Sequence, residues 1–88
     1  MKRTVTVVPE AGLHARPAAK FVETANEYAA DVRIAPAGGD PVDAASMLAV
    51  TGLGVEHGAD VTISAEGEDA EAALDALEAL LSTPESDG

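Results

Sequence analysis

Residues 61–81 read VTISAEGEDAEAALDALEALL and hold, one after the other, the two patterns that decide the fold. In residues 61–65 apolar and polar side chains alternate, which is typical of a strand with one buried face. From residue 69 onward the apolar residues recur at helical spacing, which predicts a helix over residues 69–81 with Asp69 as its N-cap. The acids of residues 66–69 complement the positive end of that helix, and we therefore interpret them as structural and not as a cation site.

Further strands follow from the same alternation. Residues 4–7 and 32–34 each place aliphatic side chains on one face and polar side chains on the other. Residues 41–44 follow a turn with Gly38 and Gly39, which suits a tight hairpin. Pro41 cannot donate a ladder hydrogen bond, so we expect this short strand at the edge of the sheet.

Two more helices occupy the intervals between the strands. The apolar residues from Ala18 to Tyr28 form one stripe over about three turns. Pro17 falls in the first turn, where backbone N–H groups lack intrahelical partners and a proline is tolerated. Ser46 and Gly52 bracket a short helix, the serine as N-cap and the glycine as the residue that stops it.

These elements fit one small domain. The chain has 88 residues, which is too few to bury two separate cores. Helices that cover only one face of a small sheet indicate the α+β class and an open-faced β-sandwich, whose second sheet face meets solvent. We expect a single domain over residues 1–82, followed by a flexible acidic tail over residues 83–88.

The charge of the chain is uneven and limits its function. Sixteen acids against five bases give a formal net charge of −11, and every base lies before residue 34. This charge and the presence of only one Tyr and one Phe disfavour nucleic-acid binding. The chain has no cysteine, no signal-peptide pattern and no apolar run long enough to span a membrane. We expect a cytoplasmic protein without membrane insertion, whose acidity suits a high-salt interior.

The clearest chemical signal is Gly12-Leu-His-Ala-Arg-Pro-Ala18, between the first strand and the first long helix. His14 falls at the helix start, where the N–H groups of Ala15 and Arg16 are unpaired and the helix dipole favours an anion. Arg16 adds a fork of donors suited to phosphate oxygens. The positive helix end also keeps a ring nitrogen of His14 unprotonated and nucleophilic. These residues indicate a phosphoryl-accepting or anion-binding histidine, and a plain polar residue at a helix start is the alternative.

Two other residues have simpler interpretations. His57 lies in a glycine-flanked turn without a basic neighbour, and we interpret it as a surface residue. A metal site that joins it to His14 has no supporting ligand spacing. Ser46 is first a helix cap and second a candidate regulatory phosphosite.

Residues 12–18 and 46–55 resemble two motifs of the HPr family, the histidine-containing phosphocarrier proteins of the phosphoenolpyruvate-dependent sugar phosphotransferase system. Residues 61–69 resemble the family's last strand and helix start, and the resemblance spans residues 2–81. It implies a four-stranded antiparallel sheet with three helices on one face.

The resemblance also implies a phosphoryl relay. Phosphorylated enzyme I would transfer its phosphoryl group to Nδ1 of His14, and phospho-His14 would donate it to a IIA domain for the uptake of a sugar such as fructose, or for dihydroxyacetone phosphorylation. Arg16 and the backbone N–H of Ala15 would stabilise the phosphoryl charge. The residues expected to contact the partners are Leu13, Pro17, Lys20, Leu48 and Thr51. The protein would act as a monomeric carrier and not as an enzyme, without cofactor or metal.

Two departures from the family pattern bear on these expectations. The first long helix carries Glu23 where many family members carry lysine, so docking should depend more on apolar contacts. Ala45 stands in place of the lysine that commonly precedes Ser46, which weakens the case for phosphorylation there. The alternative function is a regulatory binding module of the same fold that uses the surface around His14 and Ser46 without carrying phosphate. The intact pair of His14 and Arg16 favours the carrier.

Overall fold

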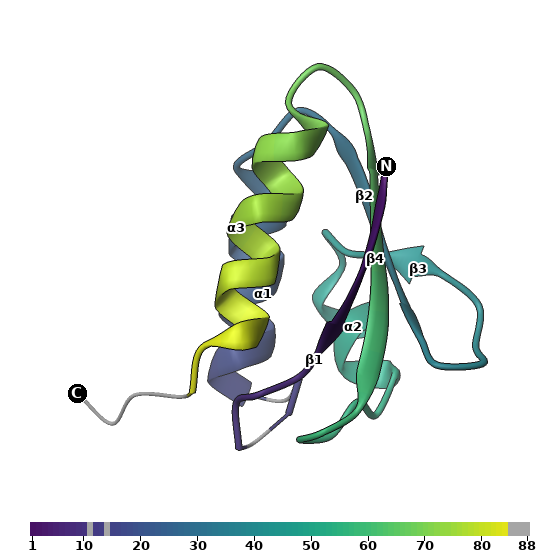
Figure 1. Ribbon diagram of the computed structural model, residues 1–88, viewed down its shortest axis with the longest axis vertical. Coiled ribbons are helices and arrows are strands. Elements are labelled where there is room, and N and C mark those ends of the chain that lie inside the picture. The colour runs from purple at the N-terminus through teal and green to yellow at the C-terminus, as the bar shows by residue number, and fades with distance from the viewer. Residues whose placement is uncertain (11, 14, 85–88) are drawn as a thin grey trace.

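The order of the secondary structure elements is the one predicted. A computed structural model describes residues 1–10, 12–13 and 15–84, so that His14 and most of the expected acidic tail lie outside the described residues. In chain order the elements are β1 (Lys2–Thr6), α1 (Ala15–Asn26), β2 (Asp31–Pro36), β3 (Val42–Asp43), α2 (Met47–Gly52), β4 (Asp60–Glu66) and α3 (Ala70–Ser82) (Figure 1).

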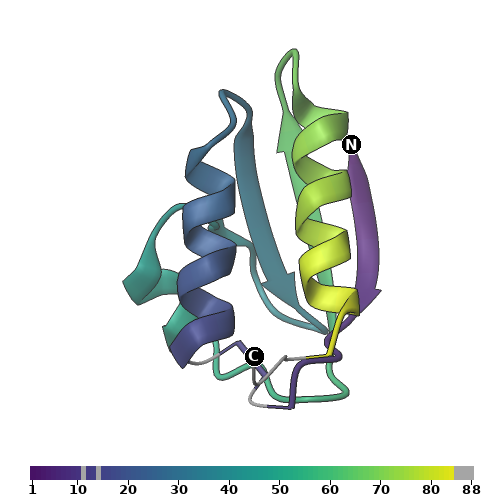
Figure 2. The ribbon, with the colours of Figure 1, turned by 90° about the vertical axis from the view of Figure 1, so that its left-hand side faces the viewer.

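The four strands form one antiparallel sheet in the order β1-β4-β2-β3. The short strand β3 lies at an edge, as the proline before it predicts. Helices α1 and α3 lie side by side over one face of the sheet (Figure 2). The α+β open-faced sandwich is therefore confirmed.

The core lies between the sheet and the helices. Along β2 and β4 buried residues alternate with half-buried or exposed ones, and the buried set faces the apolar stripes of α1 and α3. Aliphatic side chains dominate this layer, and one aromatic ring joins them. The largest fully buried side chains are Phe21, Leu13, Ile34, Ile63, Leu74, Leu77, Leu81, Val7, Val50 and Val61.

Two helix ends differ from the prediction. Asp69 precedes α3 as expected, but its side chain makes no capping hydrogen bond to that helix. Its two carboxylate oxygens accept instead from the backbone N–H groups of Ala29 and Ala30, both at 2.8 Å. Those two amides follow α1, and they occupy the carboxylate oxygens that would otherwise cap α3. Asp69 therefore connects the end of α1 to the start of α3. Helix α2 ends at Gly52, but the positive φ that follows a helix occurs at Gly54, with φ 67°.

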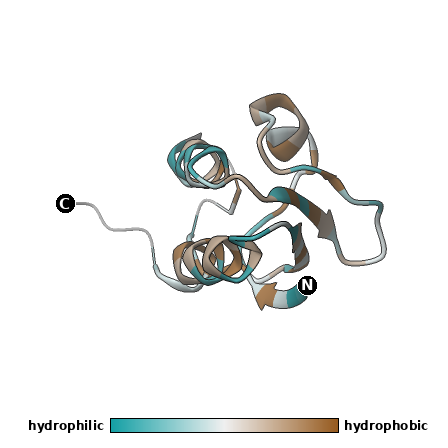
Figure 3. Ribbon diagram, turned by 90° about the horizontal axis from the view of Figure 1, so that it is seen from above, coloured by the Kyte–Doolittle hydropathy of each residue, from teal (hydrophilic) through white to brown (hydrophobic). Residues whose placement is uncertain are grey.

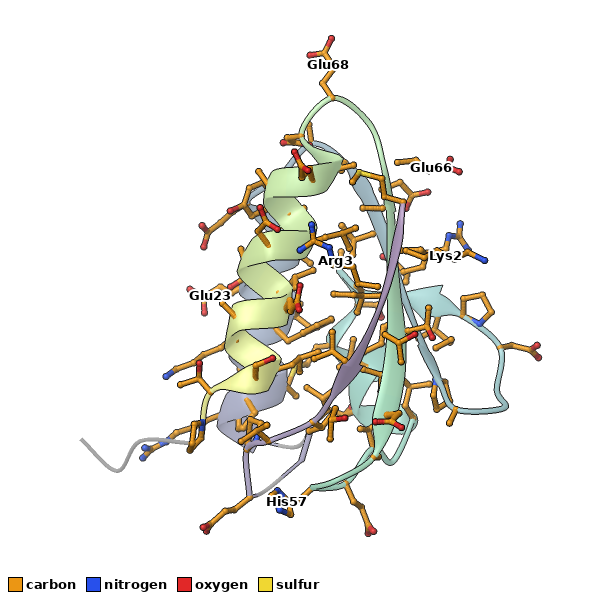
Figure 4. All side chains as sticks on the ribbon, in the orientation of Figure 1. Lys2, Arg3, Glu23, His57, Glu66 and Glu68 are labelled. Carbon is orange, nitrogen blue, oxygen red and sulfur yellow. The ribbon has the colours of Figure 1, made fainter. Side chains whose placement is uncertain are left out.

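One basic residue of β1 faces the helices and not the open side of the sheet. Arg3 donates through Nη1 to the carboxylates of Asp75 and Glu78 on α3, the latter at 2.8 Å. These bonds, above all the one to Asp75, raise the pKa of Arg3 above its ordinary value. Figure 4 shows Arg3 directed toward α3 and Lys2 on the opposite side of the strand. The pairing joins the edge strand β1 to the acidic face of α3.

The remaining carboxylates leave the protein with strong self-repulsion, because the formal charge is −11. We expect the free energy of unfolding to rise as KCl increases from about 0.1 M to about 1 M, since the Debye length falls to about 3 Å over this range. Urea unfolding at each KCl concentration measures the effect. Stability that stays flat or falls with added KCl would contradict the interpretation of the acidity as a high-salt feature.

Candidate functional site

The connection from β1 to α1 begins with residues held by main-chain bonds on two sides. The backbone N–H of Val7 donates to the Ala59 carbonyl, and the N–H of Gly58 donates back to the Val7 carbonyl, both at 2.8 Å. The N–H of Val8 donates to the carbonyl of Leu81 near the end of α3, also at 2.8 Å. This start of the connection is therefore fixed to the 55–59 segment, which precedes β4, and to α3.

The later part of the connection returns to the same segment. The N–H of Gly12 donates to the Pro9 carbonyl at 2.9 Å and closes a turn, and the N–H of Leu13 donates to the Val55 carbonyl at 2.9 Å. Gly12 has φ 67°, and a Cβ atom placed there would lie 2.4 Å from the oxygen of Val55 and 2.7 Å from Cα of Glu56. Only glycine accommodates both the backbone conformation and this close approach.

The burial of Leu13 and Pro17 corrects the expectation that both contact partners. The side chain of Leu13 is fully buried in the core, and Pro17 is buried in the first turn of α1. Both side chains face inward, so their apolar character serves packing. They hold the start of α1 against the body of the protein.

The first turn of α1 presents the chemistry that an anion needs. The helix begins at Ala15, directly after His14 in the sequence, and its first turn contains no acidic residue. The first N–H groups of a helix have no intrahelical partner and carry the positive end of the dipole. Pro17 lacks an N–H, so Ala15, Arg16 and Ala18 supply these donors. The side chain of Arg16 is exposed beside them.

An apolar surface lies next to this helix end. Helix α2 packs against α1 and turns Val50 inward, which leaves Leu48 85% exposed and Met47 41% exposed. Figure 3 shows that α2 is coloured mostly as hydrophobic. Thr51 is half-buried, and its hydroxyl donates to the Met47 carbonyl at 2.8 Å. Adjacent exposed apolar side chains of this kind form a candidate contact surface for another protein.

We refer to Arg16, Lys20, Met47, Leu48 and Thr51 as the α1–α2 surface. Arg16 and Lys20 are exposed on α1 and supply its positive charges. Met47 was not among the residues expected from the sequence. The signal in the sequence was the length of the helix, because a helix as short as α2 cannot bury all its apolar side chains.

Ser46 occupies the capping position that the sequence predicts. Its side-chain oxygen accepts from the N–H of Ala49 at 3.2 Å, and its backbone is extended, as an N-cap requires. Within the described residues, no group of three His, Asp or Glu side chains is placed to hold a metal ion. No helix in this part of the chain is both long and apolar enough to cross a bilayer.

The fold and the site define a small α+β domain that offers a helix N-terminus and an arginine to an anionic group, next to an apolar contact surface. Residues 1–83 match the family model described as the PTS HPr component phosphorylation site. The chain belongs to the HPr family, the phosphocarrier proteins of the phosphotransferase system.

Three relatives support this assignment. The chain is 70% identical to the phosphocarrier protein HPr of Haloferax volcanii over 98% of both chains. It is 49% identical to the phosphocarrier protein HPr of Streptomyces coelicolor over 91% of this chain and 86% of that protein. The crystal structure of HPr from Bacillus anthracis superposes with a TM-score of 0.88 at 42% identity, covering 92% of this chain and 95% of that chain. The similarity to a protein from Haloferax agrees with the high-salt interpretation of the acidic composition.

The contact between Gly12 and Val55 can be tested by adding one methyl group. Gly12→Ala and Gly54→Ala both place alanine at φ 67°, but a Cβ at residue 54 would meet no atom within 4 Å. We expect Gly54→Ala to lower the free energy of unfolding by about 1 kcal/mol. Gly12→Ala should cost about 3 kcal/mol, because overpacking adds to the conformational cost. Urea unfolding measures both values, and equal costs for the two variants would show that the close approach does not constrain the connection.

Proposed function

We propose that this chain carries a phosphoryl group on His14. The observation that supports the proposal is the start of α1 directly after His14, with no acid in its first turn and with Arg16 exposed beside it. Membership of a family of phosphocarriers supplies the reaction class. His14 itself lies outside the described residues, so the proposal depends on the residues on either side of it.

The transfer is a displacement at phosphorus between two nitrogen nucleophiles. A ring nitrogen of His14, which we assign as Nδ1, attacks the phosphorus of a phosphohistidine on the donor, enzyme I. The new P–N bond forms as the P–N bond to the donor breaks, and the electron pair of that bond returns to the donor ring. The helix N–H groups and Arg16 stabilise the charge on the phosphoryl oxygens. Because donor and acceptor are both imidazoles, the step is close to balanced and can run in reverse toward the next acceptor.

The α1–α2 surface is the proposed docking site for the partners. Leu48 and Met47 would enter an apolar recess on enzyme I and on a IIA domain in turn, while Arg16 and Lys20 would meet acidic side chains on the rim. Leu13 and Pro17 are left out of this surface because they are buried. We place the reaction in the cytoplasm, with a monomeric carrier that serves the uptake of a sugar such as fructose or the phosphorylation of dihydroxyacetone.

A regulatory binding module that does not carry a phosphoryl group on His14 is the second candidate. It would use the same exposed Leu48 next to Ser46, and phosphorylation of the Ser46 hydroxyl would be its switch. The cap bond from Ala49 uses an oxygen lone pair of Ser46 and leaves the hydroxyl proton available. That module would contact partners through the surface around His14 and Ser46 but would need no phosphoryl acceptor, so the presence of both His14 and Arg16 favours the carrier.

Labelling with phosphoenolpyruvate and enzyme I tests the carrier. The wild-type protein should take up one acid-labile phosphoryl group, because a phosphoimidazole hydrolyses in acid, and His14→Ala should take up none. His57→Ala is the matched control, since it removes the chain's other histidine and should keep the label. Absence of label on a folded wild-type protein in buffers of matched salt concentration would overturn the proposal. That result would favour the regulatory module, which needs no phosphoryl acceptor at residue 14.

The apolar part of the docking surface can be separated from the chemistry. Leu48→Ala should raise KM for phosphorylated enzyme I about fivefold and leave kcat unchanged, because it removes binding shared by ground state and transition state. The melting temperature should not change, since Leu48 is 85% exposed. Ser64→Ala on the open sheet face is the control and should leave KM unchanged. A fall in kcat with an unchanged KM would place Leu48 outside the docking surface.

A further inference from the structure

A histidine side chain reaches the β1–α1 connection from the 55–59 segment. Nδ1 of His57 lies 2.8 Å from the backbone carbonyl oxygen of Val8. Figure 4 shows the His57 ring at the end of the molecule where this connection runs. Among the described side chains, His57 makes the one hydrogen bond to the main chain of residues 7–10, 12 and 13.

The contact determines which ring nitrogen carries a proton. A carbonyl oxygen can only accept, so the bond to Val8 exists only when Nδ1 of His57 is protonated. In the neutral ring this leaves Nε2 without a proton, because the bond at one nitrogen selects the tautomer. Without such a bond, a neutral exposed histidine in water prefers the opposite tautomer.

Val8 lies at the start of the β1–α1 connection, so the bond from His57 can affect the conformation of that connection. The N–H of Val8 is held by Leu81, and its carbonyl is held by His57, so both of its polar backbone groups are used. Beyond Val8 the chain leaves the 55–59 segment and returns to it at Leu13, whose N–H donates to Val55. The two ends of this excursion are therefore attached to residues two apart in one segment. The main chain makes the attachment at Leu13. At the other end the ring of His57 holds Val8, next to the main-chain bonds of Val7 with Gly58 and Ala59.

We propose that His57 is a positioning residue for phosphoryl transfer: its ring fixes the Val8 end of the connection, and thereby the approach of the chain to His14 at the helix start. The proposal rests on the function proposed above for His14. In this scheme His57 does not touch the phosphoryl group. It acts by restricting the β1–α1 connection to fewer conformations, those from which transfer can occur. A solvent-exposed hydrogen bond of this kind corresponds to an effect of about three- to tenfold on the rate.

The tautomer is the direct test of the contact and needs no transfer activity. In ¹⁵N–¹H correlation spectra recorded in mildly alkaline buffer, the neutral ring of His57 should show the pattern of the Nδ1–H tautomer. Assignment comes from the loss of these signals in His57→Ala. A ring found in the Nε2–H tautomer would overturn the proposal.

Three variants test the consequence for transfer. His57→Ala should lower kcat about three- to tenfold with enzyme I and with a IIA domain alike, with KM unchanged, and should speed hydrogen exchange at the N–H of Leu13. His57→Asn should restore kcat, because its amide nitrogen occupies the place of Nδ1 and donates the same bond. Glu56→Ala, an exposed neighbour whose side chain makes no hydrogen bond among the described residues, is the control and should match the wild type.

The outcomes separate this proposal from the proposed function. An unchanged kcat in His57→Ala, or a loss that His57→Asn does not restore, would overturn the positioning role while leaving His14 as the phosphoryl carrier. A wild-type protein that takes up no label would overturn the carrier function. The tautomer and the exchange rate at Leu13 would then still decide whether the ring holds the connection.

Discussion

The close contact between Gly12 and the carbonyl of Val55 is the constraint on which the site depends. Because residue 12 has no Cβ, the chain can approach within hydrogen-bonding distance and Leu13 can donate to Val55. That bond directs the side chain of Leu13 into the core, and the buried Leu13 and Pro17 then set where α1 begins. Arg16 and the start of the helix therefore face solvent because Leu13 and Pro17, on either side of them, are buried. The chemistry at the surface is a consequence of packing beneath it.

The sequence predicts the regular elements well and the contacts between them poorly. Strong alternation in residues 61–65 and the helical stripe of α3 depend on neighbours in sequence, so the pattern alone identifies them. Asp69 shows where such reasoning fails. A carboxylate before a helix favours capping, but here its oxygens accept hydrogen bonds from two amides that follow α1. Leu13 was expected to contact partners from the family resemblance, and only the fold shows that its side chain faces the core. The start of α1 next to His14 could be predicted because it needs only the boundary of the helix. The bond from His57 to Val8 could not be predicted, because its acceptor is a main-chain carbonyl, which every residue type has.

The distribution of charge supports the same location for the site. Within the described residues the ion pairs involve Arg3 with Asp75 and Glu78, and Arg33 with Asp31. Arg3 is thereby used between β1 and α3, and Arg33 lies on the open face of the sheet. In this part of the chain Arg16 and Lys20 make no such pair, and both are on the first turns of α1. Lys2 also makes no ion pair there, so two of the three unpaired bases of a protein with a formal charge of −11 lie near the start of α1. Concentrated salt screens the positive charges of Arg16 and Lys20 over short distances. The N–H donors at the start of the helix are fixed in place, so salt should weaken their interaction with an anion least.

The 55–59 segment links the stability of the sheet to the geometry of the site. It leads directly into β4, which lies inside the sheet between β1 and β2, and it also holds both ends of the β1–α1 connection. Because β1 pairs only with β4, the bonds from Val7 to residues 58 and 59 continue that pairing past the end of the strand. The connection can therefore reach its final form only after two strands that are distant in sequence have paired. A local opening at the edge strand β1 would release the same bonds, so the conformation required for transfer can be no more stable than the pairing of β1 with β4.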